Sequence, residues 1–183
     1  MKRKTVFTLL LIVFILSFFI TPVGYWSKKK LMQVFAPSPE IISQEDRIHL
    51  QEYDWRLKDA DWDYFNLRIS EGKPLFIHFW ASWHLPSSSE LDDIQRLYDK
   101  YKGKVDFYII TNEEREPVQE FLGKNKYTFP ITYRIVGEPA PVEILEPSGT
   151  YIIDTEGSIL VKSLDSKDWY NDKIKEILDA IGN

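Results

Sequence analysis

The run from Leu75 to Trp80 constrains the fold of this 183-residue chain more than any other segment. It is short and almost entirely apolar, as in a strand that is buried on both faces of a sheet. Between about residues 87 and 102, apolar side chains then recur at spacings of three and four, which predicts an amphipathic helix: Leu91, Ile94, Leu97, Tyr98 and Tyr101. A buried strand that leads directly into such a helix indicates an α/β domain.

The remaining pattern supplies further strands and helices. Two aromatic-rich segments, Tyr53–Leu57 and Trp62–Ile69, predict a hairpin that precedes the buried strand. The elements expected after it are a strand at Val105–Thr111, a helix at Glu114–Lys124, an extended segment at Phe129–Arg134, a hairpin of Thr150–Asp154 and Ile159–Leu164, and a closing helix at Trp169–Ile181. This order predicts an α/β sandwich around a mixed sheet.

The amino terminus predicts a membrane anchor. No charged residue occurs from Thr5 to Ile20, and extending the run to Trp26 gives about 33 Å of helix, enough to cross a hydrocarbon core of about 30 Å. A cleaved signal peptide is the alternative, but no small-x-small site follows Ile20. We therefore expect residues 1–26 to be an uncleaved anchor with one transmembrane helix at about 5–26, residues 27–48 a tether, and residues 49–183 the folded domain.

The charge distribution limits the kinds of molecule that the protein is expected to bind. The first 30 residues hold six Lys or Arg and no acid, so the remaining 153 carry 17 basic and 28 acidic side chains. An acidic body repels phosphate, which argues against nucleic acid as a partner. The basic residues that flank the apolar run are typical of a membrane segment, and the short amino-terminal tail is expected to stay in the cytoplasm.

Cysteine is absent from the whole sequence. This excludes disulfides, zinc-thiolate sites, iron-sulfur ligation and any enzyme that attacks through its own thiolate.

The segment Phe79-Trp80-Ala81-Ser82-Trp83 ends the first central strand and opens the first helix. With Gly72-Lys73-Pro74 before the strand, and Thr150–Asp154 followed by Gly157, the chain from about residue 50 to 183 resembles the membrane-anchored, TlpA-like thioredoxins of bacteria. The resemblance implies a thioredoxin-like fold, a central mixed sheet flanked by helices, here with an amino-terminal hairpin extension and one transmembrane helix. It also implies a single-pass protein of the bacterial cytoplasmic (inner) membrane with its domain on the extracytoplasmic or periplasmic side.

The chain departs from that family at the working residues. The family motif Trp-Cys-x-x-Cys reads Trp83-His84-Leu85-Pro86-Ser87 in this sequence, so His84 and Ser87 occupy the two cysteine positions. A serine hydroxyl forms no mixed disulfide, so we expect no catalytic residue, no cofactor and no dithiol chemistry. The family's cis-proline lies three residues before an aromatic, whereas Pro147 precedes Tyr151 by four, which leaves the isomer of Pro147 open.

Three polar residues near this motif need an explanation. Ser87 and Glu90 are spaced as a capping box, which would account for Ser87 without any function. His78 interrupts the apolar strand where the resemblance places a buried acid, and a hydrogen-bonded core histidine is the favoured interpretation. The alternatives are that His78 activates Ser87 as a base, or that His78 and His84 share a metal ion.

The resulting hypothesis is a protein-binding or scaffolding module, more plausibly a non-enzyme than an enzyme. Its expected partner is another envelope protein or an extended polypeptide segment, and the resemblance suggests a role in envelope protein or cytochrome assembly. The proposed binding surface consists of Trp83, His84, Leu85, Pro86, Pro130 and Pro147. The alternatives are a metal-binding or non-redox enzymatic site on His84 and His78, and indirect support of a disulfide reductase by presenting or competing for its clients.

Overall fold

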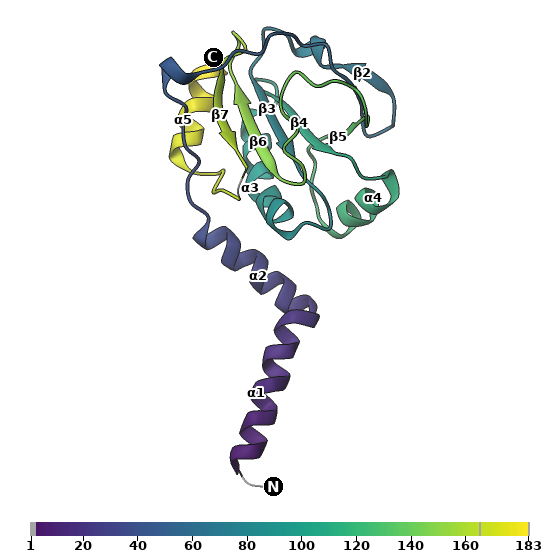
Figure 1. The fold of residues 1–183 in the computed structure, drawn as a ribbon, viewed down its shortest axis with the longest axis vertical. Coiled ribbons are helices and arrows are strands. Elements are labelled where there is room, and N and C mark those ends of the chain that lie inside the picture. The colour runs from purple at the N-terminus through teal and green to yellow at the C-terminus, as the bar shows by residue number, and fades with distance from the viewer. Residues whose placement is uncertain (1–2, 165, 183) are drawn as a thin grey trace. The chain divides into compact units, whose positions relative to one another are not determined.

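The computed structural model describes residues 3–164 and 166–182, and it divides the chain into two compact units, residues up to Phe35 and residues from Ala36 onward. The amino-terminal unit consists of α1 (Arg3–Ile20) and α2 (Pro22–Phe35). Figure 1 shows both units, and each is described here by itself.

The amino-terminal unit is not the single continuous helix that the sequence predicts for residues 5–26. The chain bends after α1, and Gly24 permits the bend because a Cβ at this position would lie 1.9 Å from the carbonyl oxygen of Phe18. Neither described helix is by itself both long and apolar enough to cross a membrane. The pair Arg3–Phe19 and Val23–Phe35, bent by 69°, meets the length and composition requirement together.

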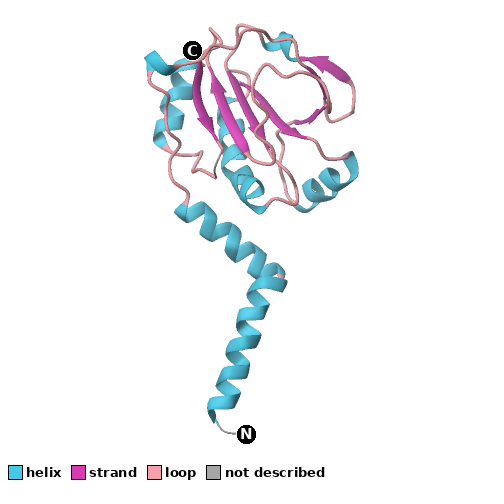
Figure 2. Ribbon diagram, in the orientation of Figure 1, coloured by secondary structure: helices cyan, strands magenta, loops and turns pink. Residues whose placement is uncertain are grey.

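The larger unit is built on a seven-stranded mixed sheet in the order β2-β1-β5-β4-β3-β6-β7. Strand β3 pairs parallel with β4, and β4 pairs parallel with β5, whereas β3 and β6 are antiparallel. The strands are β1 (Arg56–Lys58), β2 (Tyr64–Asn66), β3 (Leu75–Phe79), β4 (Asp106–Thr111), β5 (Ile131–Arg134), β6 (Gly149–Ile153) and β7 (Ile159–Ser163). The predicted α/β architecture with a mixed sheet is confirmed (Figure 2).

Both predicted hairpins form. Strands β1 and β2 are antiparallel, with Leu57 opposite Phe65, and they are shorter than predicted because a 3₁₀ helix begins at Leu67. Strands β6 and β7 are joined by a turn in which Gly157 has a φ of 83°, a conformation that glycine adopts without strain. The predicted hairpin of Thr150–Asp154 and Ile159–Leu164 is therefore confirmed.

Side-chain alternation along the strands creates a core on each face of the sheet. Phe76 packs in one core with residues of α3 (Leu85–Tyr101), α4 (Arg115–Lys124) and α5 (Asp172–Ile181). Ile77 and Phe79 pack in the other core, together with side chains of loops and of the first hairpin. The sequence of β3 is apolar except at His78 because the strand is covered on both faces.

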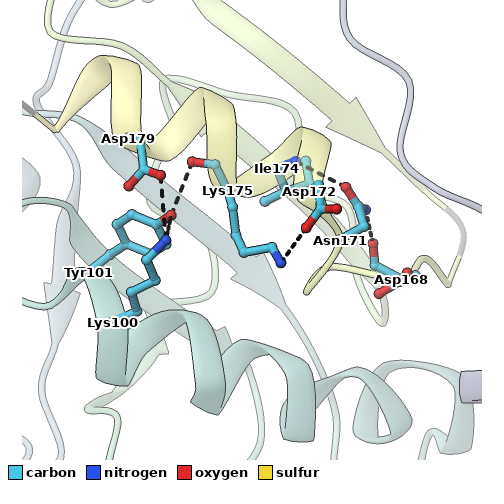
Figure 3. A network of polar contacts seen from close by, with 8 residues as sticks. All are labelled: Lys100, Tyr101, Asp168, Asn171, Asp172, Ile174, Lys175 and Asp179. Atoms are coloured by element: carbon cyan, nitrogen blue, oxygen red, sulfur yellow. Dashed lines mark hydrogen bonds and ion pairs between the residues drawn. The ribbon is translucent and has the colours of Figure 1, made fainter.

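A polar network fastens the closing helix α5 to α3 (Figure 3). The Tyr101 hydroxyl donates to the backbone oxygen of Lys175 over 3.0 Å, and Lys100 Nζ lies 2.8 Å from the Tyr101 oxygen and 3.4 Å from Asp179 Oδ2. The side chain of Asn171 caps α5 by accepting from a backbone N–H of its first turn. These contacts fix the end of the domain against the helix whose start forms the candidate site.

The segment after α2 runs along strand β7. The backbone N–H of Ile42 donates to the Leu160 oxygen over 2.8 Å, and the N–H of Ile159 donates to the Ile48 oxygen over 2.9 Å. Much of the stretch that the sequence predicts as a tether, residues 27–48, is therefore either helical in α2 or hydrogen-bonded to the domain.

Candidate functional site

Helix α3 starts beside the carboxyl end of β3 after a short connecting turn, with His84 at the end of that turn and Ser87 in the first turn of the helix. The turn is closed by the His84 N–H, which donates to the Ala81 oxygen over 3.1 Å. His84 is the N-cap of α3, and its Nδ1 accepts from the Ser87 N–H over 3.4 Å. The predicted capping box is wrong, because the helix begins at Leu85 and not after Ser87.

Ser87 is a structural residue of this turn. Its side chain is fully buried, and its Oγ accepts from the Ala81 N–H over 3.2 Å. The Oγ also lies 3.2 Å from the His84 oxygen and 3.2 Å from His84 Nδ1. A hydroxyl that is buried and bonded in this way is not available to attack a substrate.

His78 lies in β3 and is completely buried. Its Nδ1 is 2.9 Å from Oγ1 of Thr150, which is the residue opposite it on β6. Its Nε2 has no hydrogen-bond partner among the described residues. Burial lowers the pKa of His78 to about 3, against the opposing effect of the Ser87 backbone, so the ring is neutral.

The histidine-based alternatives gain no support from this geometry. His78 hydrogen-bonds Thr150 and not the Ser87 hydroxyl, so it is not placed as a base for Ser87. Within residues 3–164 and 166–182, no group of three or more His, Asp or Glu side chains is arranged to hold a metal ion.

Glu90 is the residue of this region whose role the sequence analysis missed. Its carboxylate is buried and accepts from Trp169 Nε1 over 2.6 Å and from the Lys167 N–H over 2.9 Å. Burial raises the pKa of Glu90 to about 7, although these hydrogen bonds and one from Ser148 oppose the shift. The available signal was helical spacing, because Glu90 precedes Ile94 by four residues and so shares the apolar face of α3.

The loop before β6 lies next to Glu90. The peptide bond between Glu146 and Pro147 is cis, which answers the question that the sequence left open. Arg134 donates two hydrogen bonds to the Glu146 carboxylate, at 2.8 and 2.9 Å, and Asn112 donates a third over 2.8 Å. The adjoining Ser148 places its Oγ 3.4 Å from Glu90 Oε2. Side chains distant in sequence therefore hold this loop beside α3.

A second carboxylate fixes the turn that carries Trp83. Both Glu113 oxygens are used here: Oε1 accepts from the Ser82 hydroxyl over 2.7 Å, and Oε2 accepts from the Ser82 N–H over 2.5 Å. Trp83 itself is 70% exposed, and its ring meets the His84 ring edge to face at 5.6 Å between centroids. A large apolar side chain is thus held in solvent by a bonded turn.

We refer to Trp83, His84, Leu85, Pro86 and Pro147 as the docking rim. Leu85, Pro86 and Pro147 are half-buried. Pro130, also predicted for this surface, lies just before β5, whose first residue Ile131 pairs with Ile109, and it lines a separate cavity beside the first residues of β4. Trp80 and Phe129 are buried in the core.

Strand order, the helix that starts beside the carboxyl end of β3, and the cis-proline loop beside that helix together define a thioredoxin-like fold. Solved structures agree. A DsbF homologue from Corynebacterium diphtheriae is similar with a TM-score of 0.61 at 17% identity, over 78% of this chain and 92% of that one. A putative protein disulfide isomerase from Bacteroides thetaiotaomicron is similar with a TM-score of 0.60 at 20% identity, over 80% and 95%.

Residues 50–162 match the AhpC/TSA family, and the chain belongs to that family. Several of its homologues are thiol-disulfide oxidoreductases. It is 25% identical to the thiol-disulfide oxidoreductase ResA of Bacillus cereus over 159 residues, 84% of either chain. It is 29% identical to the thioredoxin-like protein YneN of Bacillus subtilis over 114 residues, 60% of this chain and 66% of that protein.

Proposed function

We propose that this protein is a membrane-anchored, extracytoplasmic, TlpA-like member of its family that has lost dithiol-disulfide exchange and binds another polypeptide through the docking rim. The observation that carries the proposal is the pairing of a fully bonded, sulfur-free turn at His84 and Ser87 with an exposed tryptophan directly beside it. Its partner is an envelope protein or an extended polypeptide segment, in envelope protein or cytochrome assembly.

The loss of redox chemistry follows from the requirements of the reaction. Disulfide exchange needs a thiolate that attacks and a sulfur that leaves, and the chain contains no cysteine. The side chains of Ser87 and His84 instead accept hydrogen bonds from backbone N–H groups of the turn itself. The turn at the start of α3 is therefore present without the thiol groups that the reaction needs.

Binding through the docking rim is supported by rigidity and exposure together. Trp83 is held by the Ser82–Glu113 contacts, and the neighbouring proline loop is held by Arg134 and Asn112. A preorganised aromatic side chain loses little entropy on binding, and such side chains dominate the energy of protein interfaces. The rim therefore has the properties of an anchor for a partner chain.

The membrane assignment is supported by the first unit. The bent pair of α1 and α2 satisfies the length and composition of a span, and basic residues flank its apolar run on both sides. In this proposal the span lies in the bacterial cytoplasmic (inner) membrane and carries the domain on the extracytoplasmic side.

The binding proposal is tested by affinity capture with the full-length protein from a detergent extract of membranes. We expect Trp83→Ala and Leu85→Ala each to weaken capture of a specific partner by more than about 1 kcal/mol, and His84→Ala to have a smaller effect. Tyr64→Ala is the matched control, because Tyr64 is an aromatic residue of similar exposure, 63%, on the edge strand β2. Equal loss in the Tyr64 and Trp83 variants would contradict the proposal.

The redox proposal is tested by insulin reduction. We expect no activity from the native protein, whereas His84→Cys with Ser87→Cys should form an internal disulfide, because the start of α3 supplies both the spacing and a dipole that stabilises a thiolate. Exchange by this double variant should be slow, because His78 occupies the position of the family's buried acid. Measurable reductase activity in the native protein would overturn the proposed loss.

A further inference from the structure

A cavity of about 520 Å³ opens at the end of the sheet opposite the docking rim. It arises because β4 begins at Asp106, whereas β5 begins at Ile131 and pairs first with Ile109. Asp106, Phe107 and Tyr108 therefore have no neighbouring strand on the β5 side within the described sheet. The cavity occupies this notch, and its volume falls within the range of about 300–1,000 Å³ typical of small-molecule sites.

The walls of the notch are mostly apolar and come from both faces of the sheet. Phe65 stacks on Tyr108 at 6.0 Å between ring centroids on one face. On the other face, Tyr98 meets Phe107 edge to face at 5.5 Å. Aromatic rings on both sides of an open gap favour a flat, apolar ligand group.

The two carboxylates that line the cavity are already bonded. Asp106 Oδ2 accepts from the Ser70 hydroxyl over 2.6 Å and lies 3.3 Å from Lys73 Nζ, and the Tyr108 hydroxyl approaches Ser70 Oγ at 2.5 Å. Asp59 accepts from backbone N–H groups of its own turn at 2.9 and 3.0 Å. The charge of Asp106 is therefore balanced by Lys73, and the Asp59 carboxylate is held against its own turn.

Among the charged residues that line the cavity, Lys102 has a side chain that can still bind an anionic group. Its nearest carboxylate is that of Asp99, 3.9 Å away, and its side chain is 58% exposed. Its Nζ lies 5.7 Å from the centre of the Tyr98 ring, which forms part of the aromatic wall. An ammonium group at this position favours an anion attached to the apolar body of the ligand.

We propose that the notch binds a small aromatic acid, with its ring between the aromatic walls and its carboxylate at Lys102. An extended peptide is a poorer occupant, because three strand residues offer too short an edge for stable pairing. The proposal is independent of the function assigned to the docking rim, which lies at the other end of the sheet.

The test is ¹⁹F NMR titration of the full-length protein in detergent with 4-(trifluoromethyl)phenylacetate, an aromatic ring with one carboxylate. We expect saturable line broadening, and at least about fivefold weaker binding for the uncharged methyl ester and for Lys102→Gln, since each loses the charge pairing. Ile69→Glu, at an exposed lining residue, should weaken binding as well by placing a negative charge beside the ligand.

Lys104→Gln is the matched control, because Lys104 is exposed and close in sequence to Lys102 but does not line the cavity. Its affinity should stay within about twofold of the native value. Absence of saturable binding by the native protein would overturn the proposal. Equal losses in the Lys102 and Lys104 variants would also overturn it, because they would show that the anion responds only to general surface charge.

Discussion

The start of α3 has a buried layer, made by His78, Ser87 and Glu90, and the exposed docking rim in front of it. In the buried layer, most polar side-chain atoms are hydrogen-bonded within the protein, as in the bond from Trp169 to Glu90, and His78 Nε2 is the exception among these three side chains. On the rim, Trp83 leaves 70% of its surface to solvent. The difference teaches that the polar groups around the start of α3 serve the stability of the domain, while a large apolar side chain directly beside them stays exposed.

The largest expected effect on this contrast comes from protonating His78. Its pKa is about 3 in the folded protein against an ordinary 6.5, so the unfolded chain binds the proton more readily. Above pH 6.5 the ring is neutral in both the folded and the unfolded protein. As the pH drops toward 3, the contribution of His78 to the free energy of unfolding falls by about 5 kcal/mol in total. Urea unfolding of the native protein and of His78→Asn at successive pH values isolates this contribution, because Glu90 titrates in both proteins: the difference between their free energies of unfolding should change by about 5 kcal/mol between pH 6.5 and pH 3. If the free energies of unfolding of the two proteins ran parallel across this pH range, His78 would not titrate as a buried group.

Removing Glu90 should have the next largest effect. Glu90→Ala leaves Trp169 Nε1 and the Lys167 N–H buried without an acceptor, which should lower the free energy of unfolding by about 4 kcal/mol. Glu90→Gln retains a carbonyl acceptor and should lose clearly less. Denaturant unfolding of both variants measures the difference, and equal losses would mean that the two donors find other partners.

The ionisation of Glu90 should oppose that of His78. The pKa of Glu90 is about 7 in the folded protein and exceeds its ordinary 4.5. Its contribution to the free energy of unfolding is therefore fully present below pH 4.5 and is lost as the pH rises to 7, by about 3 kcal/mol. The two slopes nearly cancel between pH 4.5 and 6.5. In Glu90→Gln the cancellation should disappear, and stability should rise with pH across that interval. An unchanged profile would show that Glu90 does not titrate there.

The smallest expected effect is on the rim. Trp83→Ala should change the free energy of unfolding by no more than about 0.5 kcal/mol, because most of the side chain is already in solvent. Thermal or denaturant unfolding measures it alongside the Glu90 variants. A loss comparable to that of Glu90→Ala would erase the distinction between rim and buried layer.

The architecture could be predicted from the sequence because it is written in local periodicity. The apolar run at Leu75 and the three-and-four spacing from Leu91 to Tyr101 identify β3 and α3 without any tertiary information. The exposure of Trp83 was predictable for a similar reason, because a tryptophan in the turn that opens a helix is hard to bury.

The inner contacts could not be predicted in the same way. The spacing of Ser87 and Glu90 fits a capping box, but Glu90 instead bonds Trp169, which is 79 residues away in sequence. Likewise, Arg134 and Glu146 form their ion pair across the chain, and nothing in their local sequence identifies it. The placement of Pro130 depended on the register of β5 against β4, which periodicity does not reveal. Local sequence patterns identify helices and strands, whereas hydrogen-bond and ion-pair partners depend on how those helices and strands pack.

The segment that follows α2 has a consequence for how molecules of this protein meet one another. Strand β7 ends the sheet, and an uncovered edge strand is a template for pairing with another chain. Ile42 and Ile48 occupy part of this edge through their backbone hydrogen bonds to Leu160 and Ile159. The opposite edge, β2, is only three residues long. The chain thus blocks its own route to edge-to-edge aggregation, and proteolytic removal of residues 36–48 would reopen it.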